Sequence, residues 1–423
     1  MKNYRKRIKK LISLSAAAGM TLSFLCGCSA PGQEESSEPV SELTGLSESF
    51  LNGTDEFSVN LLKEAASDPK YNGENILVSP ESVLMALGMT AEGASGDTLS
   101  EMEQVLAGGM SIKDFSSSMQ YELQNEKASK DVKFNIANSV WIRDDSDRIR
   151  IKEDFLSRTK DYYSAETFKE DFNNDTLKKI NGWVNDNTDG MIDNIIQEIP
   201  SSAVMYLINA IAFEGKWEEE YKDHQINEDD TFTNSKGEEE KACMLSSTEN
   251  IYLEGKDVTG FIKKYKGGKY IFTALLPNEG ITLEECISDM TDKTFRELID
   301  CESAEDVLVK IPEFEYDFST SLKQYLSDMG IKTAFSGSAD FSKMADSEGL
   351  FISDVIHKTH IELNRKGTKA SASTAVIMKD GAAPGHEEEP KQVYLDRPFV
   401  YAIYNNETGM PVFMGVVNSI KDK

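Results

Sequence analysis

The sequence predicts an α+β fold in a single domain, and three observations support this prediction. A continuous apolar run at 270–277 suits a strand that is covered on both faces. Apolar residues at helical spacing follow positions 80 and 177, so helices and strands alternate along the chain. No long Gly/Ser-rich or Pro-rich linker interrupts residues 52–423, which favours one domain there.

The individual elements follow from local patterns. Ser79 is a favoured N-cap residue and Pro80 is tolerated in a first helical turn, so we expect a helix to begin there. Further along the chain, the apolar patterns predict a strand at 136–142, an amphipathic helix at 177–187, a buried strand at 205–213 and the covered strand at 270–277.

The first 27 residues have the layout of a secretory signal, with basic residues in the first ten positions and an apolar run at 11–25. The run is short for a transmembrane helix and ends at Leu25-Cys26-Gly27-Cys28, which resembles a bacterial lipobox. We therefore expect cleavage before Cys28, lipidation of that residue, and a location in the cell envelope outside the cytoplasmic membrane. The alternatives are an ordinary secreted protein cleaved nearby, or later release from the membrane.

Residues 28–51 are rich in Ser, Glu, Pro and Gly, a composition typical of a disordered tether. The expected domains are therefore a signal peptide at 1–27, a tether at 28–51 and a globular domain at 52–423. The formal net charge is −28, and removal of residues 1–27 deletes six positive charges and no negative ones, which takes it to −34. Nucleic acid is not an expected partner, because such a surface repels phosphate.

The residues do not nominate an ordinary active site. The chain has four histidines and lacks the Gly-x-Ser-x-Gly, His-Glu-x-x-His and glycine-rich phosphate-binding motifs. We expect no enzyme activity, no cofactor and no metal site. Beyond the signal, the cysteines are Cys243, Cys286 and Cys301, in no zinc-binding pattern; we expect small buried thiols, with a disulfide as the alternative.

The most informative segment is 363–376, which alternates like a strand but lacks bulky side chains. Thr368, Ala370, Ala372 and Thr374 would point to one face, and Lys369, Ser371 and Ser373 to the other. A permanent core strand would carry larger β-branched or aromatic residues. The pattern therefore predicts a strand that enters a sheet that already exists.

Together with other blocks, this segment makes the chain resemble a serpin. Residues 367–374 follow the family's hinge pattern Gly-Thr-x-Ala-x-Ala-x-Thr, and 396–399 read Asp-Arg-Pro-Phe. Further matches in family order are Asn-x-x-x-Ser-Pro-x-Ser at 75–82, Ile-Asn-x-Trp-Val-x-x-x-Thr-x-Gly-x-Ile at 180–192, Asn-Ala-x-x-Phe-x-Gly-x-Trp at 209–217 and Phe-Met-Gly at 413–415.

The resemblance implies a single domain with three β-sheets, about nine helices and an exposed reactive-centre loop at about 365–395. It also implies a monomeric inhibitor of serine endopeptidases that acts as a suicide substrate. A protease cuts the loop, the freed segment 368–381 inserts into the main sheet, and the acyl-enzyme is trapped. The hinge residues implied are Gly367, Thr368, Ala370, Ala372 and Thr374. No proline lies in 368–381 to remove a hydrogen-bond donor from the new strand.

The family's usual spacing from the hinge glycine places the cut bond between Gly381 and Ala382. The small neighbours, among them Ala383, suit elastase-like or subtilisin-like proteases, whereas Lys379 before Asp380 would suit a trypsin-like enzyme and Met378 a chymotrypsin-like one. The alternatives are a non-inhibitory binding module and an inhibitor of cysteine proteases.

The resemblance also assigns two control regions within the sheet. The shutter residues, which govern how two central strands separate, would be Ser79, Ser82, Asn209 and His357. The breach, where the loop enters, would include Trp217, Arg365 and Glu313. In most relatives the last two positions hold Glu and Lys. The signs are reversed here, so an ion pair between Arg365 and Glu313 is expected; the alternative is two unrelated surface charges.

Overall fold

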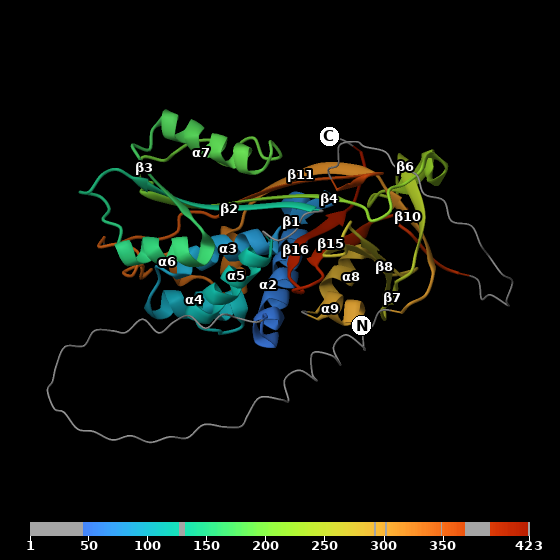
Figure 1. Cartoon of the computed structure of the whole chain (residues 1–423), viewed down its shortest axis with the longest axis horizontal. Helices are drawn as coiled ribbons and strands as arrows, with labels where there is room; N and C mark the ends of the chain where they lie inside the picture. Colours follow the sequence, from blue (N-terminus) through green and yellow to red (C-terminus); the bar gives the residue numbers. More distant parts are fainter. Residues whose placement is uncertain are drawn as a thin grey trace, which may run out of the picture. The chain divides into compact units, whose positions relative to one another are not determined.

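Three β-sheets and nine α-helices make up the part of the chain that the computed structural model describes, which is residues 45–126, 132–291, 293–300, 303–347, 349–368 and 390–421. The predicted α+β fold is confirmed (Figure 1). The α-helices are α2 (Glu48–Ser67), α3 (Pro80–Ala91), α4 (Gly96–Ala107), α5 (Ile112–Glu126), α6 (Glu153–Tyr163), α7 (Asn174–Asn187), α8 (Leu283–Asp289), α9 (Thr294–Asp300) and α10 (Lys323–Met329), and the 3-10 helices are η1 (Pro69–Tyr71), η2 (Asp223–Gln225) and η3 (Thr333–Phe335).

Sheet A contains the first two predicted hinge residues, Gly367 and Thr368, and has six strands. Neighbours are antiparallel except for β2 and β3, which run parallel. In spatial order the strands are β11 (Phe314–Ser321), β12 (Ile356–Asn364), β13 (Gly367–Thr368), β4 (Met205–Lys216), β2 (Val132–Arg143) and β3 (Glu166–Glu170).

Sheets B and C lie beside the end of sheet A at which β4 and β12 terminate (Figure 1). Sheet B has six strands in the order β1 (Ile76–Val78), β16 (Pro411–Val417), β15 (Phe399–Asn405), β9 (Tyr270–Pro277), β8 (Val258–Lys264) and β7 (Tyr252–Glu254). Sheet C has four strands in the order β14 (Lys391–Tyr394), β10 (Val307–Pro312), β6 (Glu239–Glu249) and β5 (Ile226–Thr233).

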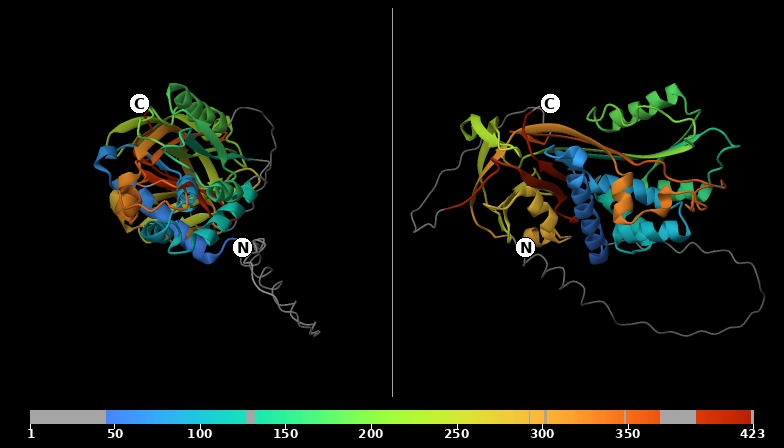
Figure 2. Two further views of the ribbon diagram at one scale, coloured as in Figure 1. Left: turned by 90° about the vertical axis from the view of Figure 1, so that its left-hand side faces the viewer. Right: turned by 180° about the vertical axis from the view of Figure 1, so that it is seen from behind.

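Helix α7 covers one face of sheet A, and α3 lies on the opposite face with α4, α5 and α6 beyond it (Figures 1 and 2). A hydrophobic cluster of its own joins α7 to β2 and β4, and includes Trp141, Ile180, Val184 and Ile208. The main core lies on the other side of the sheet and extends through sheets B and C. The helix α7 is therefore packed on the β2–β4 half of sheet A, away from the main core.

Local signals account for most of these elements. The Ser79 side chain caps α3 as predicted, and accepts a hydrogen bond from the backbone nitrogen of Ser82. Helix α7 begins at Asn174, three residues earlier than predicted, because Asn173 and Thr176 form a capping box. Strand β9 has the predicted bounds, whereas β2 and β4 extend beyond the predicted segments to Val132–Arg143 and Met205–Lys216.

The N-terminal boundary differs from the expectation of a tether over 28–51. Helix α2 begins at Glu48, is capped by Ser47, and buries Phe50 completely. The last four residues of the expected tether are therefore helical, because Phe50 packs into the main core. Residues 28–44 of the tether, Cys28 among them, and the signal at 1–27 lie outside the described residues. In the described part, no helix is both long and apolar enough to span a bilayer.

The two described cysteines beyond the signal are free thiols. Cys243 is half-buried and Cys286 is buried, and burial raises the pKa of each to about 11. Cys301 lies outside the described residues.

Candidate functional site

Strand β13 lies between β12 and β4 and consists of two described residues, Gly367–Thr368. Gly367 pairs with Asn364 and Lys216, and Thr368 pairs with Leu363 and Gly215. Among the described residues, no ladder joins β12 directly to β4. The facing edges of these strands beyond β13, which we call the slot, therefore present backbone groups to a strand that could lie between them.

Gly367 occupies a position that only glycine fits. Its φ is +149°, a region that L side chains rarely adopt. A β-carbon there would collide with the carbonyl oxygen of Gly215 and lie 2.7 Å from the α-carbon of Lys216. The hinge glycine is thus required by the close approach of β13 to β4.

Thr368 is buried, with 3% of its surface exposed, and its hydroxyl lies 2.7 Å from the Tyr265 hydroxyl. Burial raises the pKa of Tyr265 far above its usual value, so that the phenol stays protonated. Thr368 therefore faces the core, and a charged side chain at this position would have no access to water.

A platform formed by Trp217 and Tyr221 holds the turn that precedes β13. The Trp217 backbone nitrogen donates to the Lys366 carbonyl at 3.0 Å, and the Tyr221 backbone nitrogen donates to the Arg365 carbonyl at 3.1 Å. The indole nitrogen of Trp217 donates to the Asn364 carbonyl at 3.0 Å. The ring of Trp217 is buried and stacks on Tyr265, with ring centroids 4.6 Å apart. The predicted breach tryptophan therefore holds the turn through two hydrogen bonds of its own.

The expected ion pair between Arg365 and Glu313 is present, with 3.1 Å between Nε and Oε1. Burial by itself would raise the pKa of Glu313, but the hydrogen bonds of Arg365 and Cys243, together with the charge of Arg365, outweigh it and hold that pKa below its usual value. Arg365 also lies 3.7 Å from Glu228 of sheet C. Cys243, which the sequence did not nominate for this region, has its sulfur 3.8 Å from Nη2 of Arg365.

His357, on β12, is buried and accepts a hydrogen bond from the Ser79 backbone nitrogen at 3.0 Å through Nε2. Burial lowers the pKa of His357 to about 4, so the ring is neutral at pH 7. His360 points to the other face of β12, where Nδ1 lies 2.8 Å from Asp317. The neutral imidazole of His357 thus connects β12 to the first turn of α3.

The other shutter residues connect the same helix to β4. The Ser82 hydroxyl donates to the Asn209 side-chain oxygen, and the Asn209 amide donates to Asn138 of β2 at 2.9 Å. Asn138 in turn donates to the Tyr163 carbonyl at 2.8 Å. The start of α3 therefore contacts both edges of the slot. The sequence analysis did not nominate Asn138, although an amide within a predicted apolar strand could have marked it as a candidate.

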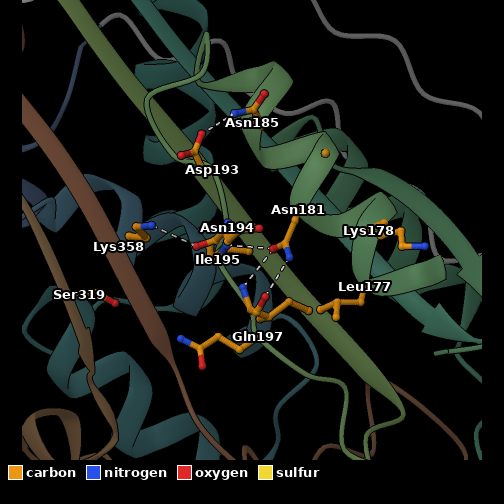
Figure 3. A pocket seen from close by; sticks show the side chains of 12 residues that line it. Leu177, Lys178, Asn181, Asn185, Asp193, Asn194, Ile195, Gln197, Ser319 and Lys358 are labelled. Atoms are coloured by element: carbon orange, nitrogen blue, oxygen red, sulfur yellow. Dashed lines mark hydrogen bonds between the residues drawn. The ribbon is translucent and has the colours of Figure 1, made fainter. Parts of the chain in front are cut away.

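A cavity of about 910 Å³ lies between α7, the segment that follows it and strands β11 and β12 (Figure 3). The side chain of Asn181 holds the segment after α7, accepting from the backbone nitrogens of Ile195 and Ile196. Lys358 of β12 donates to the Asn194 carbonyl at 3.3 Å across this cavity. Several polar groups of the lining thus satisfy one another, and the cavity is bounded mainly by α7 and the segment after it, with Ser319 of β11 and Lys358 of β12 on the other side.

The structure brings the predicted residues together in two groups, with Ser79, Ser82, Asn209 and His357 at the shutter and Trp217, Glu313, Arg365, Gly367 and Thr368 around the turn before β13. The remaining hinge residues, Ala370, Ala372 and Thr374, lie outside the described residues. The same is true of the predicted cut bond, Gly381 and Ala382, and of its neighbours Lys379, Asp380 and Ala383.

Comparisons with known proteins identify the same family throughout. The serpin family, "Serpin (serine protease inhibitor)", matches residues 52–420. A serpin-like protein of Thermococcus kodakarensis is 30% identical over 383 residues, which are 89% of this chain and 87% of that protein. The leukocyte elastase inhibitor of Bos taurus is 30% identical over 366 residues, 82% of this chain and 93% of its own. The native state of tengpin, a thermophilic serpin, has a TM-score of 0.82 at 38% identity, and covers 90% of this chain and 97% of its own.

Proposed function

This chain belongs to the serpin family, and from that premise we propose that it inhibits serine endopeptidases as a suicide substrate. The observation that supports the proposal most directly is the position of β13, whose two residues already pair with both β12 and β4. A loop cut beyond this point could continue the strand into the slot.

The pairing of β13 defines a register for that continuation. If the antiparallel register continues, Thr374 would stand between His357 and Asn209, and Met378 would stand opposite Met205, where β4 begins. A new ladder of this length, at roughly 0.5–1.5 kcal/mol per net hydrogen bond, would contribute on the order of 10 kcal/mol. A bond cut at Gly381-Ala382 would then lie just past the end of the sheet, at the pole opposite the breach.

We propose an elastase-like or subtilisin-like protease as the target. The residues Gly381, Ala382 and Ala383 are small and suit a shallow specificity pocket. The leukocyte elastase inhibitor of Bos taurus, by its name an inhibitor of an elastase, is among the relatives at 30% identity.

The mature chain should be incubated with elastase-like, subtilisin-like and trypsin-like proteases, and run on a denaturing gel after boiling. The expected result is a complex that survives boiling, together with a released C-terminal peptide that begins at Ala382 by mass spectrometry. A peptide that begins at Asp380 would identify a trypsin-like target instead. Cleavage by every protease with no stable complex would support the non-inhibitory binding module.

The cleaved form is also expected to be far more heat-resistant than the intact form, because the slot is filled only after cleavage. Melting of both forms by circular dichroism measures this difference. Equal melting temperatures would contradict insertion.

We further propose that the protein is anchored by a lipid at Cys28 outside the cytoplasmic membrane. The basic cluster, the short apolar run and the cysteine after Gly27 support this proposal. Mass spectrometry of the N-terminal peptide from the membrane fraction should find acyl chains on Cys28, and Cys28→Ala should move the protein out of that fraction. An unmodified mature N-terminus would refute the anchor.

A further inference from the structure

A lysine lies buried behind the platform that holds the hinge turn. Lys263 is on β8 of sheet B and only 4% of its surface is exposed, whereas its neighbour Lys264 is exposed. Its ammonium lies 2.6 Å from the Glu249 carboxylate, at the end of β6 in sheet C. An ion pair between the buried Lys263 and the largely buried Glu249 therefore joins sheet B to sheet C directly behind the breach.

The same ammonium faces both aromatic rings of the platform. It lies 5.4 Å from the centroid of the Trp217 ring and 4.6 Å from that of the Tyr221 ring. Both distances are within the range of cation–π attraction, which is stronger at desolvated sites. The backbone nitrogens of these two residues donate to the carbonyls of Lys366 and Arg365, so the cation holds the groups that hold the turn.

A hydroxyl relay adds a second link between the ion pair and the platform. Ser247 donates to Glu249 at 2.6 Å, and the Tyr221 hydroxyl lies 3.2 Å from the Ser247 oxygen. Because the Ser247 hydrogen is used by Glu249, Tyr221 is the donor of that second bond. The carboxylate of Glu249 thus accepts from Lys263 and Ser247 and orients Tyr221 from the side of sheet C.

Removal of two charges from water is costly, and an apolar pair of the same volume is often as stable or more stable. A contribution to stability is therefore a weak explanation for the presence of this ion pair. Its position next to the turn suggests a role in holding that turn. We infer that Lys263 is a positioning residue of the hinge. Together with Glu249 it fixes the positions of Trp217 and Tyr221, and so restrains the C-terminal end of β4 until the loop is cut. The inference rests on the proposed function, because it concerns when the loop enters the slot.

The experiment follows the uncleaved mature chain, so it needs no target protease. Lys263→Met, Lys263→Arg and the double variant Lys263→Met with Glu249→Gln are incubated at a fixed interval below each variant's own melting temperature. Loss of native monomer to latent or polymeric forms is followed on native gels. The matched control is Arg158→Met, which leaves Glu92 buried without its partner at 2.7 Å, far from the hinge.

Lys263→Met is expected to convert about tenfold faster than the parent, which corresponds to ~1.4 kcal/mol of barrier. Lys263→Arg should convert at close to the parental rate, because a guanidinium keeps the charge and stacks on rings. The double variant, Lys263→Met with Glu249→Gln, should recover the parental melting temperature but should still convert faster than the parent. In a background of Trp141→Phe and Trp183→Phe, the emission of Trp217 should shift in Lys263→Met and return in Lys263→Arg.

The inference is overturned if Lys263→Met and Arg158→Met convert alike at matched intervals, or if the double variant recovers both stability and slow conversion. Failure of the parent to form complexes with proteases would count against the proposed function instead. If Lys263→Met does not fold, the double variant decides, since it leaves no unpaired buried charge.

Discussion

The Glu313 carboxylate accepts three hydrogen bonds from Arg365: from the backbone nitrogen at 2.8 Å, from Nε at 3.1 Å and from Nη2 at 3.3 Å. Arg365, in the turn that follows β12, is thereby held to the junction between β10 and β11. The pair is partly exposed, and its ionic part is expected to contribute about 1 kcal/mol. Its location matters more than its strength, because the turn it holds leads directly into β13.

We predict that Arg365→Glu accelerates polymerisation or conversion to a latent form on heating. Three acidic side chains would then meet, since Glu228 also lies 3.7 Å from Arg365 in the parent. The exchange Arg365→Glu with Glu313→Lys should recover part of the lost resistance, but not the bond from the backbone nitrogen of residue 365, because lysine cannot accept it. Native gels after heating provide the measurement. A double variant as fast as the single one would show that the two charges are not coupled.

If the chain inhibits proteases as proposed, Gly367→Ala should convert it from inhibitor to substrate, and we predict that the change also lowers its stability. The added β-carbon would meet the backbone of Gly215 and Lys216, which cannot give way as a flexible side chain would. A cost of several kcal/mol is expected for this combination of strain and collision. Gly337→Ala is the matched control, because a β-carbon there meets nothing within 4 Å. Equal ratios of complex to cleaved product in the two variants would contradict the prediction.

Thr368→Arg should also produce a substrate, for a different reason. The position is 3% exposed and already lies in β13, so a guanidinium would have to be desolvated there or would displace β13, from which insertion has to continue. Thr368→Val, which keeps the shape and loses only the bond to Tyr265, should remain largely inhibitory. The stoichiometry of inhibition of the two variants measures the difference, and an unchanged stoichiometry for Thr368→Arg would refute the desolvation argument.

His357 should make stability depend on pH below neutrality. Its pKa is about 4 in the folded protein and about 6.5 when unfolded, so the unfolded chain binds the extra proton between these values. The folded state therefore loses stability as pH falls from 7 towards 4, with about 2 kcal/mol lost between pH 7 and pH 5. His357→Gln should remove this part of the slope in guanidinium unfolding, whereas the exposed His224→Gln should not. A slope that is unchanged in His357→Gln would mean that other groups cause it.

The sequence by itself determined the features that depend on near neighbours in the chain. The cap at Ser79, the apolar run of β9, the freedom of Gly367 and the small residues of the hinge are all consequences of local conformational preference. The family patterns added the fold and the pairing of Arg365 with Glu313.

Only the tertiary structure decided which distant groups share one environment. Asn138 joins the shutter, Cys243 lies beside Arg365, and Lys263 is buried beneath Trp217; the sequence could mark Asn138 as an amide within an apolar strand but could not name the partners of any of the three. The start of α2 at Glu48 depends on the burial of Phe50 in the main core. The physical reason is the same in each case: desolvation and hydrogen bonding at these positions are set by residues tens to hundreds of positions away, which only packing brings together.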